Sequence, residues 1–114
     1  MTGCIFCDRV SLQILAENEL AFAIRDKCPV RPLHTLVLPK RHEPNGLDLT
    51  NAELAAVFAL SRTVRAQILE EDPNVGGFNF GLNKGVVAGQ KIDHAHFHVI
   101  PRRAGEAPPP AAQP

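Results

Sequence analysis

The stretch His94-Ala95-His96-Phe97-His98-Val99-Ile100 alternates histidines with apolar residues, and this alternation predicts a strand. Side chains on a strand alternate between its two faces, so the three histidines share one face with neighbours roughly 6.6 Å apart. Ala95, Phe97 and Val99 then point to the other face. Burying three imidazole rings without hydrogen-bond partners is costly, so this row of histidines indicates a functional site rather than ordinary packing.

Further extended segments precede the histidine stretch and predict a sheet. Each is an apolar run bounded by prolines, glycines or a polar turn, as is typical of strands. The predicted strands are 12–15 and 20–24 on either side of a turn at 16–19, then 34–38 closed by Pro39, 76–83, and 94–100. The loop 84–90 leads into the last of them.

Thr50-Asn51-Ala52-Glu53 matches a capping box, in which a hydroxyl and a carboxylate satisfy free amides at a helix start. Asp72-Pro73 ends the helical pattern. Between them, apolar residues follow helical spacing, with Ser61 among them: Leu54, Val57, Phe58, Val64 and Ile68. We therefore predict an α+β domain over residues 1–103, with a five-stranded antiparallel sheet, one long helix and a short N-terminal element. The Ala/Pro-rich tail, 104–114, is expected to be disordered.

The 114 residues are enough for one domain, and Lys plus Arg (12) balances Asp plus Glu (12). No global field would draw the protein to nucleic acid or to an anionic membrane, so we expect neither as a partner. The longest apolar runs fall short of the roughly 20 residues of a membrane span. The N-terminus lacks the pattern of a secretory signal, so we expect a soluble, cytoplasmic protein whose three cysteines are thiols or metal ligands.

Two kinds of chemistry suit the histidine row. A neutral imidazole can attack phosphorus if its other nitrogen keeps a proton, and the nearby loop offers amide donors and close backbone approach for phosphate oxygens at Asn83, Gly85, Gly89 and Gln90. His-x-His on a strand can equally present two imidazoles to a catalytic metal. Spacing alone leaves both readings open.

The histidine stretch resembles the signature of the histidine triad family, in which three histidines alternate with apolar residues and two more apolar residues follow. The similarity runs from about residue 4 to 103 and includes 22–26, 34–42 and 88–90. It implies the histidine triad fold and a homodimer with a continuous sheet. The related nucleotidyltransferase branch carries glutamine where this chain has His98, so the resemblance favours hydrolysis over transfer.

The resemblance also implies roles for single residues. His96 would be the nucleophile, His98 and His94 the other catalytic histidines, and Asp26 would grip the ribose, although Asp26 could also be a turn residue before Pro29. The implied substrate-binding residues are Ile5, Phe6, Ile24 and Leu36 around the base, together with Asp26, Asn83, Gly89, Gln90 and Lys91. Many members carry Ser or Thr at the position of Lys91. This lysine either neutralises a polyphosphate leaving group or is merely solvated.

Cys4-Ile5-Phe6-Cys7 has the two-residue spacing that lets two thiolates bind one zinc ion, although the pair could also stay reduced and simply pack. The resemblance supplies two more ligands, His42 and His94, and four closed ligands imply a structural zinc. Cys28 and His34 receive no role.

The expected function is hydrolysis of a purine nucleotide conjugate at its α-phosphate through a covalent nucleotidyl-histidine on His96. Dinucleoside polyphosphates and nucleoside phosphoramidates are the two candidate substrates. Two alternatives remain: a nucleotide-binding regulatory module with negligible turnover, and a metal-dependent enzyme built on the histidine strand.

Overall fold

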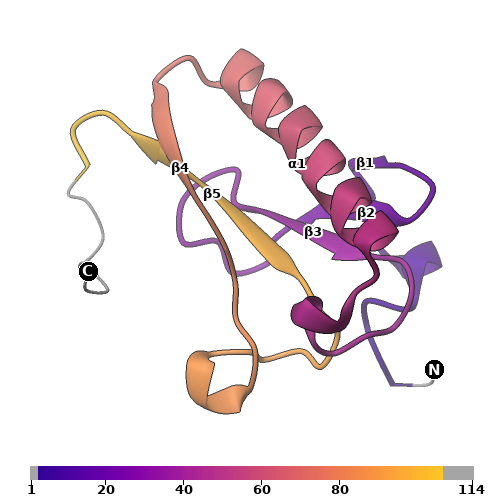
Figure 1. The fold of residues 1–114 in the computed structure, drawn as a ribbon. Helices are drawn as coiled ribbons and strands as arrows, with labels where there is room; N and C mark the ends of the chain where they lie inside the picture. Colours follow the sequence, from indigo (N-terminus) through magenta and orange to yellow (C-terminus); the bar gives the residue numbers. More distant parts are fainter. Residues whose placement is uncertain (1–2, 107–114) are drawn as a thin grey trace.

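The computed structural model describes residues 3–106, and in this part of the chain five antiparallel strands form one open sheet (Figure 1). The strands are β1 (Ala16–Glu17), β2 (Ala21–Arg25), β3 (Thr35–Pro39), β4 (Val75–Leu82) and β5 (Phe97–Arg103). Their order across the sheet is β1-β2-β3-β5-β4, so the last strand of the chain lies between β3 and β4. The predicted fold class is confirmed. The strand β4 pairs on one side only, so it forms one edge of the sheet.

The predicted capping box starts helix α1 (Asn51–Glu71). The Thr50 hydroxyl accepts a hydrogen bond from the Glu53 amide at 3.1 Å, and the Glu53 carboxylate accepts one from the Thr50 amide at 2.9 Å. Both contacts satisfy amides that a helix start leaves free. The helix stops before Pro73, as predicted, with Asp72 as its C-cap.

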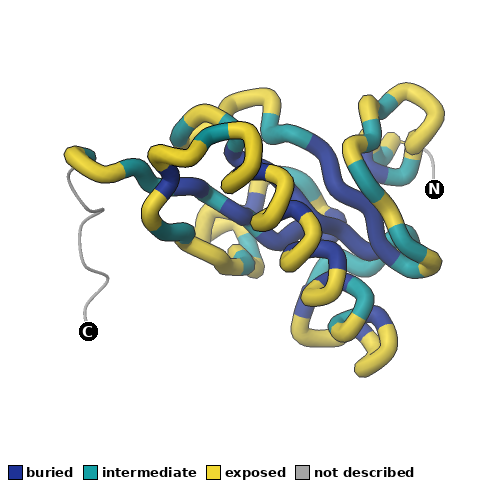
Figure 2. The backbone as a smooth tube through the Cα atoms, turned by 90° about the horizontal axis from the view of Figure 1, so that it is seen from above, coloured by how far each residue is buried: buried dark blue, intermediate teal, exposed yellow. Residues whose placement is uncertain are grey.

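Helix α1 covers one face of the sheet, and the core lies between them (Figures 1 and 2). The small side chains of Ala21 and Ala23 let the helix approach closely. The buried residues of this core include Val57, Leu60, Val64 and Ile68 from α1 and Ala21, Ala23, Val37, Phe97 and Val99 from the sheet. A second apolar cluster joins Phe6 of the N-terminal segment to Phe22, Ile24, Leu36 and Leu38. The face away from α1 therefore remains available to the functional site.

The predicted N-terminal hairpin exists, but its predicted strand at 12–15 and turn at 16–19 are wrong. Ala16 and Glu17 form β1 and pair with Ala23 and Phe22. The Asn18 side chain accepts hydrogen bonds from the amides of residues 20 and 21 at 3.2 and 2.9 Å. This side chain closes the turn locally, so the turn falls after Glu17 rather than before it.

The start of the last strand is also corrected, from His94 to Phe97. The Ala95 amide donates to the Glu43 carbonyl at 2.7 Å and the His94 ring contacts the Pro39 carbonyl at 2.9 Å. These contacts hold 94–96 outside the ladder. His94 and His96 therefore precede β5, and only His98 lies within it.

Phe58, which we placed on the buried stripe of the helix, is 47% exposed, and Leu60 is buried instead. The Phe58 ring lies beside Phe80 of β4, which is 42% exposed, with ring centroids 5.5 Å apart. Two aromatic rings are thus left at the α1–β4 edge of the molecule.

The ends of the chain add little to the core. The short N-terminal element is a 3₁₀ turn, Arg9–Ser11, and residues 104–106 form a turn in which Glu106 pairs with Arg31 at 3.0 Å. The remainder of the predicted tail, 107–114, lies outside the described residues. Within the described part, no helix is both long enough and apolar enough to cross a membrane.

Candidate active site and metal-binding group

A cavity of about 1010 Å³ lies over the face of the sheet that α1 leaves open. Strand pairing sets Ile24, Leu36 and His98 side by side across β2, β3 and β5. The His96 ring stands next to His98, with centroids 5.2 Å apart, and Phe6 packs edge-on against His96 at 5.3 Å. The cavity therefore combines an apolar wall with two imidazoles.

The orientation of His96 is fixed by the backbone just before it. Its Nδ1 lies 2.8 Å from the carbonyl oxygen of His94, and the residue is only 7% exposed. A carbonyl oxygen only accepts, so the hydrogen of the neutral ring must sit on Nδ1. Nε2 then keeps its lone pair, and His96 lines the cavity. An imidazole held in this way can act as a nucleophile or as a base.

His98 forms a chain of contacts with two residues from the β2–β3 connection. Its Nδ1 lies 2.9 Å from Nε2 of His34, and the same His34 nitrogen lies 3.5 Å from a carboxylate oxygen of Asp26. Burial, with lesser repulsion from His96 and His34, lowers the pKa of His98 to about 4. Burial also lowers the pKa of His34. Both rings are therefore neutral near pH 7.

The residues expected around a nucleoside gather in the cavity. Ile5, Phe6, Ile24, Leu36 and Asp26 all line it. One Asp26 oxygen accepts a hydrogen bond from the Cys28 amide at 2.9 Å, while the other faces His34. The proposed turn role and the proposed binding role of Asp26 are thus compatible, since a single carboxylate serves the turn and still faces the cavity.

The loop before His94 reaches the cavity with some of its predicted residues. Asn83, Gly89 and Lys91 line the cavity, and Gly89 has φ +100, a conformation that favours glycine. The Gln90 side chain instead accepts from the Gly85 amide and donates to the Pro44 carbonyl, both at 2.8 Å. Gln90 is buried outside the cavity lining, where its amide holds the loop together.

The cavity also contains residues that sequence reasoning did not single out. They include Arg25, Lys27 and His34, and Asn79, Gly81 and Ile100 from β4 and β5. The Arg25 guanidinium itself donates to Thr35 and pairs with Glu71 of α1. The contact between His34 and His98 joins positions 64 residues apart in the chain. Only the register of β3 and β5 brings them together, and no local pattern in the sequence specifies that register.

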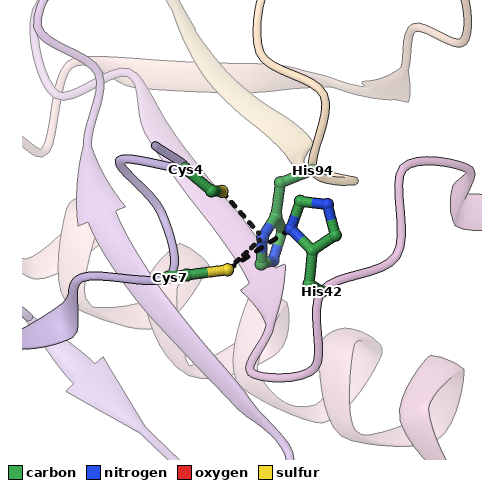
Figure 3. A group of neighbouring side chains, drawn as sticks. All are labelled: Cys4, Cys7, His42 and His94. Carbon is green, nitrogen blue, oxygen red and sulfur yellow. Dashed lines mark hydrogen bonds between the residues drawn. The ribbon is translucent and has the colours of Figure 1, made fainter. Parts of the chain in front are cut away.

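The side chains of Cys4, Cys7, His42 and His94 converge near the end of β3 and the start of β5 (Figure 3). The Cys7 sulfur lies 3.3 Å from His42 Nδ1 and 3.6 Å from His94 Nδ1, and the Cys4 sulfur lies 3.5 Å from His94 Nδ1. A tetrahedron with bonds of about 2.0–2.3 Å has edges of roughly 3.3–3.8 Å, so these separations fit ligands of one zinc ion.

The protonation of this group also suits a metal. His94 Nε2 faces the Pro39 carbonyl at 2.9 Å and must carry the hydrogen, which leaves the Nδ1 lone pair directed toward the sulfurs. Burial and the neighbouring Cys4 raise the pKa of the Cys7 thiol in the absence of a cation. These four residues could therefore hold a metal ion, and that ion would stabilise the thiolates.

Comparisons with known proteins agree with this geometry. The model of the HIT domain family matches residues 9–105. The chain is 36% identical to an adenosine 5'-monophosphoramidase of Schizosaccharomyces pombe, over 88% of this chain and 74% of the relative. It is also 36% identical to a bis(5'-nucleosyl)-tetraphosphatase (asymmetrical) of the same organism, over 85% of this chain and 53% of the relative.

A crystal structure of a Zn-bound histidine triad family protein from Mycobacterium smegmatis superposes with a TM-score of 0.81 at 32% identity, covering 91% of this chain and 78% of that one. The open five-stranded antiparallel sheet with one long helix on one face is thus the fold of a histidine triad protein. The chain belongs to the HIT domain family.

Proposed function

We propose that the protein hydrolyses a purine nucleotide conjugate at its α-phosphate, with His96 as the nucleophile. The observation that carries this proposal is the 2.8 Å contact between His96 Nδ1 and the His94 carbonyl, since it leaves Nε2 unprotonated in a residue that lines the cavity. The relatives named as a tetraphosphatase and a phosphoramidase support the same reaction class. The two substrate types they represent are our two candidates.

The reaction would run in two displacements. His96 Nε2 forms a bond to the α-phosphorus while the bond from phosphorus to the leaving group breaks, giving a nucleotidyl-histidine. Water then attacks the same phosphorus, the P–N bond to His96 breaks, and a nucleoside monophosphate leaves with the water oxygen. His98 would donate a hydrogen bond to a phosphate oxygen, with Asn83 and the Gly89 backbone nearby, because charge builds up on these oxygens.

Asp26 would bind the ribose hydroxyls, and Ile5, Phe6, Ile24 and Leu36 would enclose the base. All five residues line the cavity that also contains His96. Gln90 would not contact the substrate. It would act indirectly, because its two hydrogen bonds fix the loop that carries Gly89. His94 would contribute its carbonyl to His96 and its ring to the metal-binding group.

We further propose that Cys4, Cys7, His42 and His94 bind a structural zinc ion. The donor set and its separations support zinc, and so does the Zn-bound relative. The ion would tie the N-terminal segment to the sheet, and with it Ile5 and Phe6 at the cavity wall.

The quaternary proposal is a homodimer formed along the β4 edge. An unpaired edge strand invites pairing, and Phe58 and Phe80 leave aromatic surface beside it. A second copy with the same edge would extend the sheet and cover both rings.

The proposed chemistry is tested by turnover of diadenosine tetraphosphate and of an adenosine phosphoramidate, with wild type and His96→Ala compared with and without chelator. We expect wild type to release a nucleoside monophosphate and to form an adduct of that mass on His96 when the reaction is quenched. Nucleotide binding and circular dichroism of His96→Ala serve as controls that the cavity and fold persist.

Each alternative has its own outcome. Activity that survives in His96→Ala contradicts the mechanism. Binding without turnover in wild type indicates a regulatory binding module. Loss of turnover with chelator, while nucleotide binding and the fold stay intact, indicates a metal-dependent enzyme.

A further inference from the structure

Part of the cavity lies over β4 and β5, on the side of His98 away from the apolar wall of β2 and β3. Asn79 and Gly81 of β4 and Ile100 of β5 line it there, and the proposed reaction gives them no role. The cavity volume of about 1010 Å³ is at the upper end of the roughly 300–1,000 Å³ that is common for ligand pockets. The cavity therefore has room for a part of the substrate beyond the nucleoside and the α-phosphate.

Glycine occupies position 81 of β4 although the fold does not require it there. Gly81 lies opposite His98 in the ladder, and Asn79 lies opposite Ile100, so all four positions share the cavity face of the sheet. A Cβ built on Gly81 would meet no atom within 4 Å, and its φ is not in the left-handed region. A glycine inside a strand often marks a place where a ligand approaches the backbone closely. The missing side chain leaves the cavity floor open next to His98.

Asn79 and Arg102 bring hydrogen-bond donors to the far end of this floor. Arg102 stands two residues beyond Ile100 in β5, so it projects from the same face of the sheet. Its Nε donates to the side-chain oxygen of Asn79 at 2.6 Å. The Asn79 amide must turn its oxygen toward this donor, and its NH₂ group is left to donate to a ligand. The terminal nitrogens of Arg102 add further donors and a positive charge, and such a set suits phosphate oxygens.

The charge of Arg102 also reaches the interior of the cavity. Burial is the largest cause that lowers the pKa of His34, and repulsion by the Arg102 guanidinium lowers that pKa further. His34 itself lines the cavity. An anion in this part of the cavity would therefore lie within the field of Arg102.

We propose that Asn79, Gly81, Ile100 and Arg102 form a subsite, here called the β4 subsite, for the phosphate chain of the leaving group. This assignment rests on the proposed hydrolysis, because it gives a place to the part of the substrate that hydrolysis releases. Lys91 follows the loop expected at the α-phosphate, so it would act on phosphates near the bond that breaks. Arg102 begins roughly 13 Å along β5 from His98, so it would act on more distant phosphates. Neither a nucleoside monophosphate nor an amine leaving group would fill the β4 subsite.

Ligand binding to the His96→Ala protein tests the β4 subsite without turnover. AMP, adenosine tetraphosphate and diadenosine tetraphosphate are titrated by calorimetry into this protein with and without Arg102→Gln. We expect Arg102→Gln to weaken both tetraphosphates about fivefold and AMP very little, because AMP lacks the distant phosphates. The difference should shrink at high salt, since the contact is exposed to solvent. Arg65→Gln removes the same charge from an exposed position of α1 and should bind all three ligands like its parent.

Two substitutions of Asn79 separate ligand binding from a structural role. Asn79→Asp keeps an acceptor for Arg102 but replaces the NH₂ donor with a negatively charged oxygen. Asn79→Ala removes the contact with Arg102 and adds no charge. If Asn79 only holds Arg102 in place, the Asp variant should bind the tetraphosphates better than the Ala variant. The β4 subsite predicts the opposite order, because a carboxylate repels phosphate.

A pair of glycine substitutions tests the open floor. A Cβ at Gly81 or at Gly76 would meet no atom within 4 Å, so alanine fits the fold at both positions. Gly81 lines the cavity, whereas Gly76 does not. We expect Gly81→Ala to weaken the tetraphosphates about threefold and AMP less, and Gly76→Ala to change neither. Circular dichroism of the variants shows that the fold is retained.

Several outcomes would overturn the proposal. They are an unchanged affinity of Arg102→Gln for the tetraphosphates, equal weakening of AMP, or Asn79→Asp binding as well as Asn79→Ala. Weakening of diadenosine tetraphosphate alone would assign the second nucleoside, rather than phosphates, to this part of the cavity and reject the phosphate subsite. The expected binding pattern in a protein whose wild type turns over neither substrate would reject the proposed function and leave the β4 subsite standing. Turnover without that pattern would reject the β4 subsite alone.

Discussion

Backbone groups decide what each histidine of the site can do. The His94 carbonyl takes the Nδ1 hydrogen of His96, the Pro39 carbonyl takes the Nε2 hydrogen of His94, and the Val30 amide occupies Nδ1 of His34. Side chains of one type therefore obtain different free nitrogens. The nitrogen of His96 that lacks a backbone partner is Nε2, in a residue that lines the cavity. That of His94 is Nδ1, which lies next to the sulfurs of Cys4 and Cys7.

Lys91 is the residue on which we expect the choice of leaving group to depend. Lys91 lines the cavity together with Lys27, whereas Asp26 is the one carboxylate among the described lining residues. A polyphosphate leaving group carries more negative charge than an amine. Lys91→Ser should therefore lower kcat/KM for diadenosine tetraphosphate about 10-fold and change that for an adenosine phosphoramidate much less.

The matched control for that substitution is Lys84→Ser. Lys84 is also exposed and on the same loop, but it does not line the cavity. It should leave the ratio of the two kcat/KM values unchanged. If Lys91→Ser lowers both activities equally, Lys91 does not discriminate between leaving groups.

Glu53 connects the helix start to the β3–α1 loop and should make stability depend on pH in acid. Arg41 donates two hydrogen bonds of 2.9 Å to its carboxylate, and chiefly this contact lowers the pKa of Glu53 to about 2. Because the folded-state pKa is below the unfolded value, the contribution is complete above about pH 4.5 and is lost as the pH falls toward 2.

Glu53→Gln keeps an acceptor for the capping box and removes the charge. We expect the free energy of unfolding at pH 7 to fall by about 1 kcal/mol, a value reduced for the exposure of Arg41 to solvent. Urea unfolding between pH 7 and pH 2.5 should show the difference from wild type shrinking below pH 4.5. Glu70→Gln, an exposed position on the same helix, is the control. A difference independent of pH would rule out this role for the ion pair.

The secondary structure elements differ in how far the sequence could predict them. The start of α1 is local, because Thr50 and Glu53 satisfy each other's amides, and it was predicted correctly. The strand β4 was predicted within one residue at each end, as 76–83 against Val75–Leu82. In contrast, the start of β5 depends on the contacts of His94 with the Pro39 carbonyl and of Ala95 with the Glu43 carbonyl. The alternation of polar and apolar residues along the strand does not specify these distant partners.

The same distinction applies to the candidate site. The spacing of the cysteines and the alternation of the histidines are local features of the sequence. The family resemblance supplied His42, which the structure places with the cysteines, and Asp26, which it places near His34 in the cavity. The role of Gln90 in holding its loop and the contact of His34 with His98 depend on tertiary geometry. Phe58 was misplaced because its spacing fits the apolar stripe of the helix, although its ring lies outside the core.

The N-terminal segment, which carries Cys4 and Cys7, should depend on metal for its attachment to the sheet. Removing zinc with chelator, or Cys7→Ser, should lower Tm by about 5 °C or more and increase hydrogen exchange over residues 4–12. The core between α1 and the sheet should stay protected. Cys28→Ser removes an exposed thiol outside the group and should behave like wild type. Purified protein without stoichiometric zinc and without a response to chelator would refute the metal site.

The molecule as a whole combines a balanced charge with a locally basic cavity. The 12 basic and 12 acidic side chains cancel over the chain, whereas Lys27 and Lys91 line the cavity with Asp26 as the one carboxylate among its described lining residues. Attraction of an anionic substrate is therefore a property of the cavity rather than of the surface. This arrangement favours small nucleotides over long nucleic acids, whose binding needs an extended basic surface.

The assembly that we propose should depend on the aromatic pair at the edge of the molecule. Phe58 and Phe80 are both partly exposed beside β4, and Arg62 and Arg65 line the same shallow pocket. Around a two-fold axis, each substitution is repeated in the partner, so Phe58→Arg would add two more cations to one interface. We expect sedimentation to give twice 12.4 kDa for wild type and the monomer mass for Phe58→Arg.

Val10→Arg places the same charge on an exposed apolar residue of the N-terminal 3₁₀ turn and should remain dimeric. A monomeric wild type, or a dimeric Phe58→Arg, would exclude this edge as the interface.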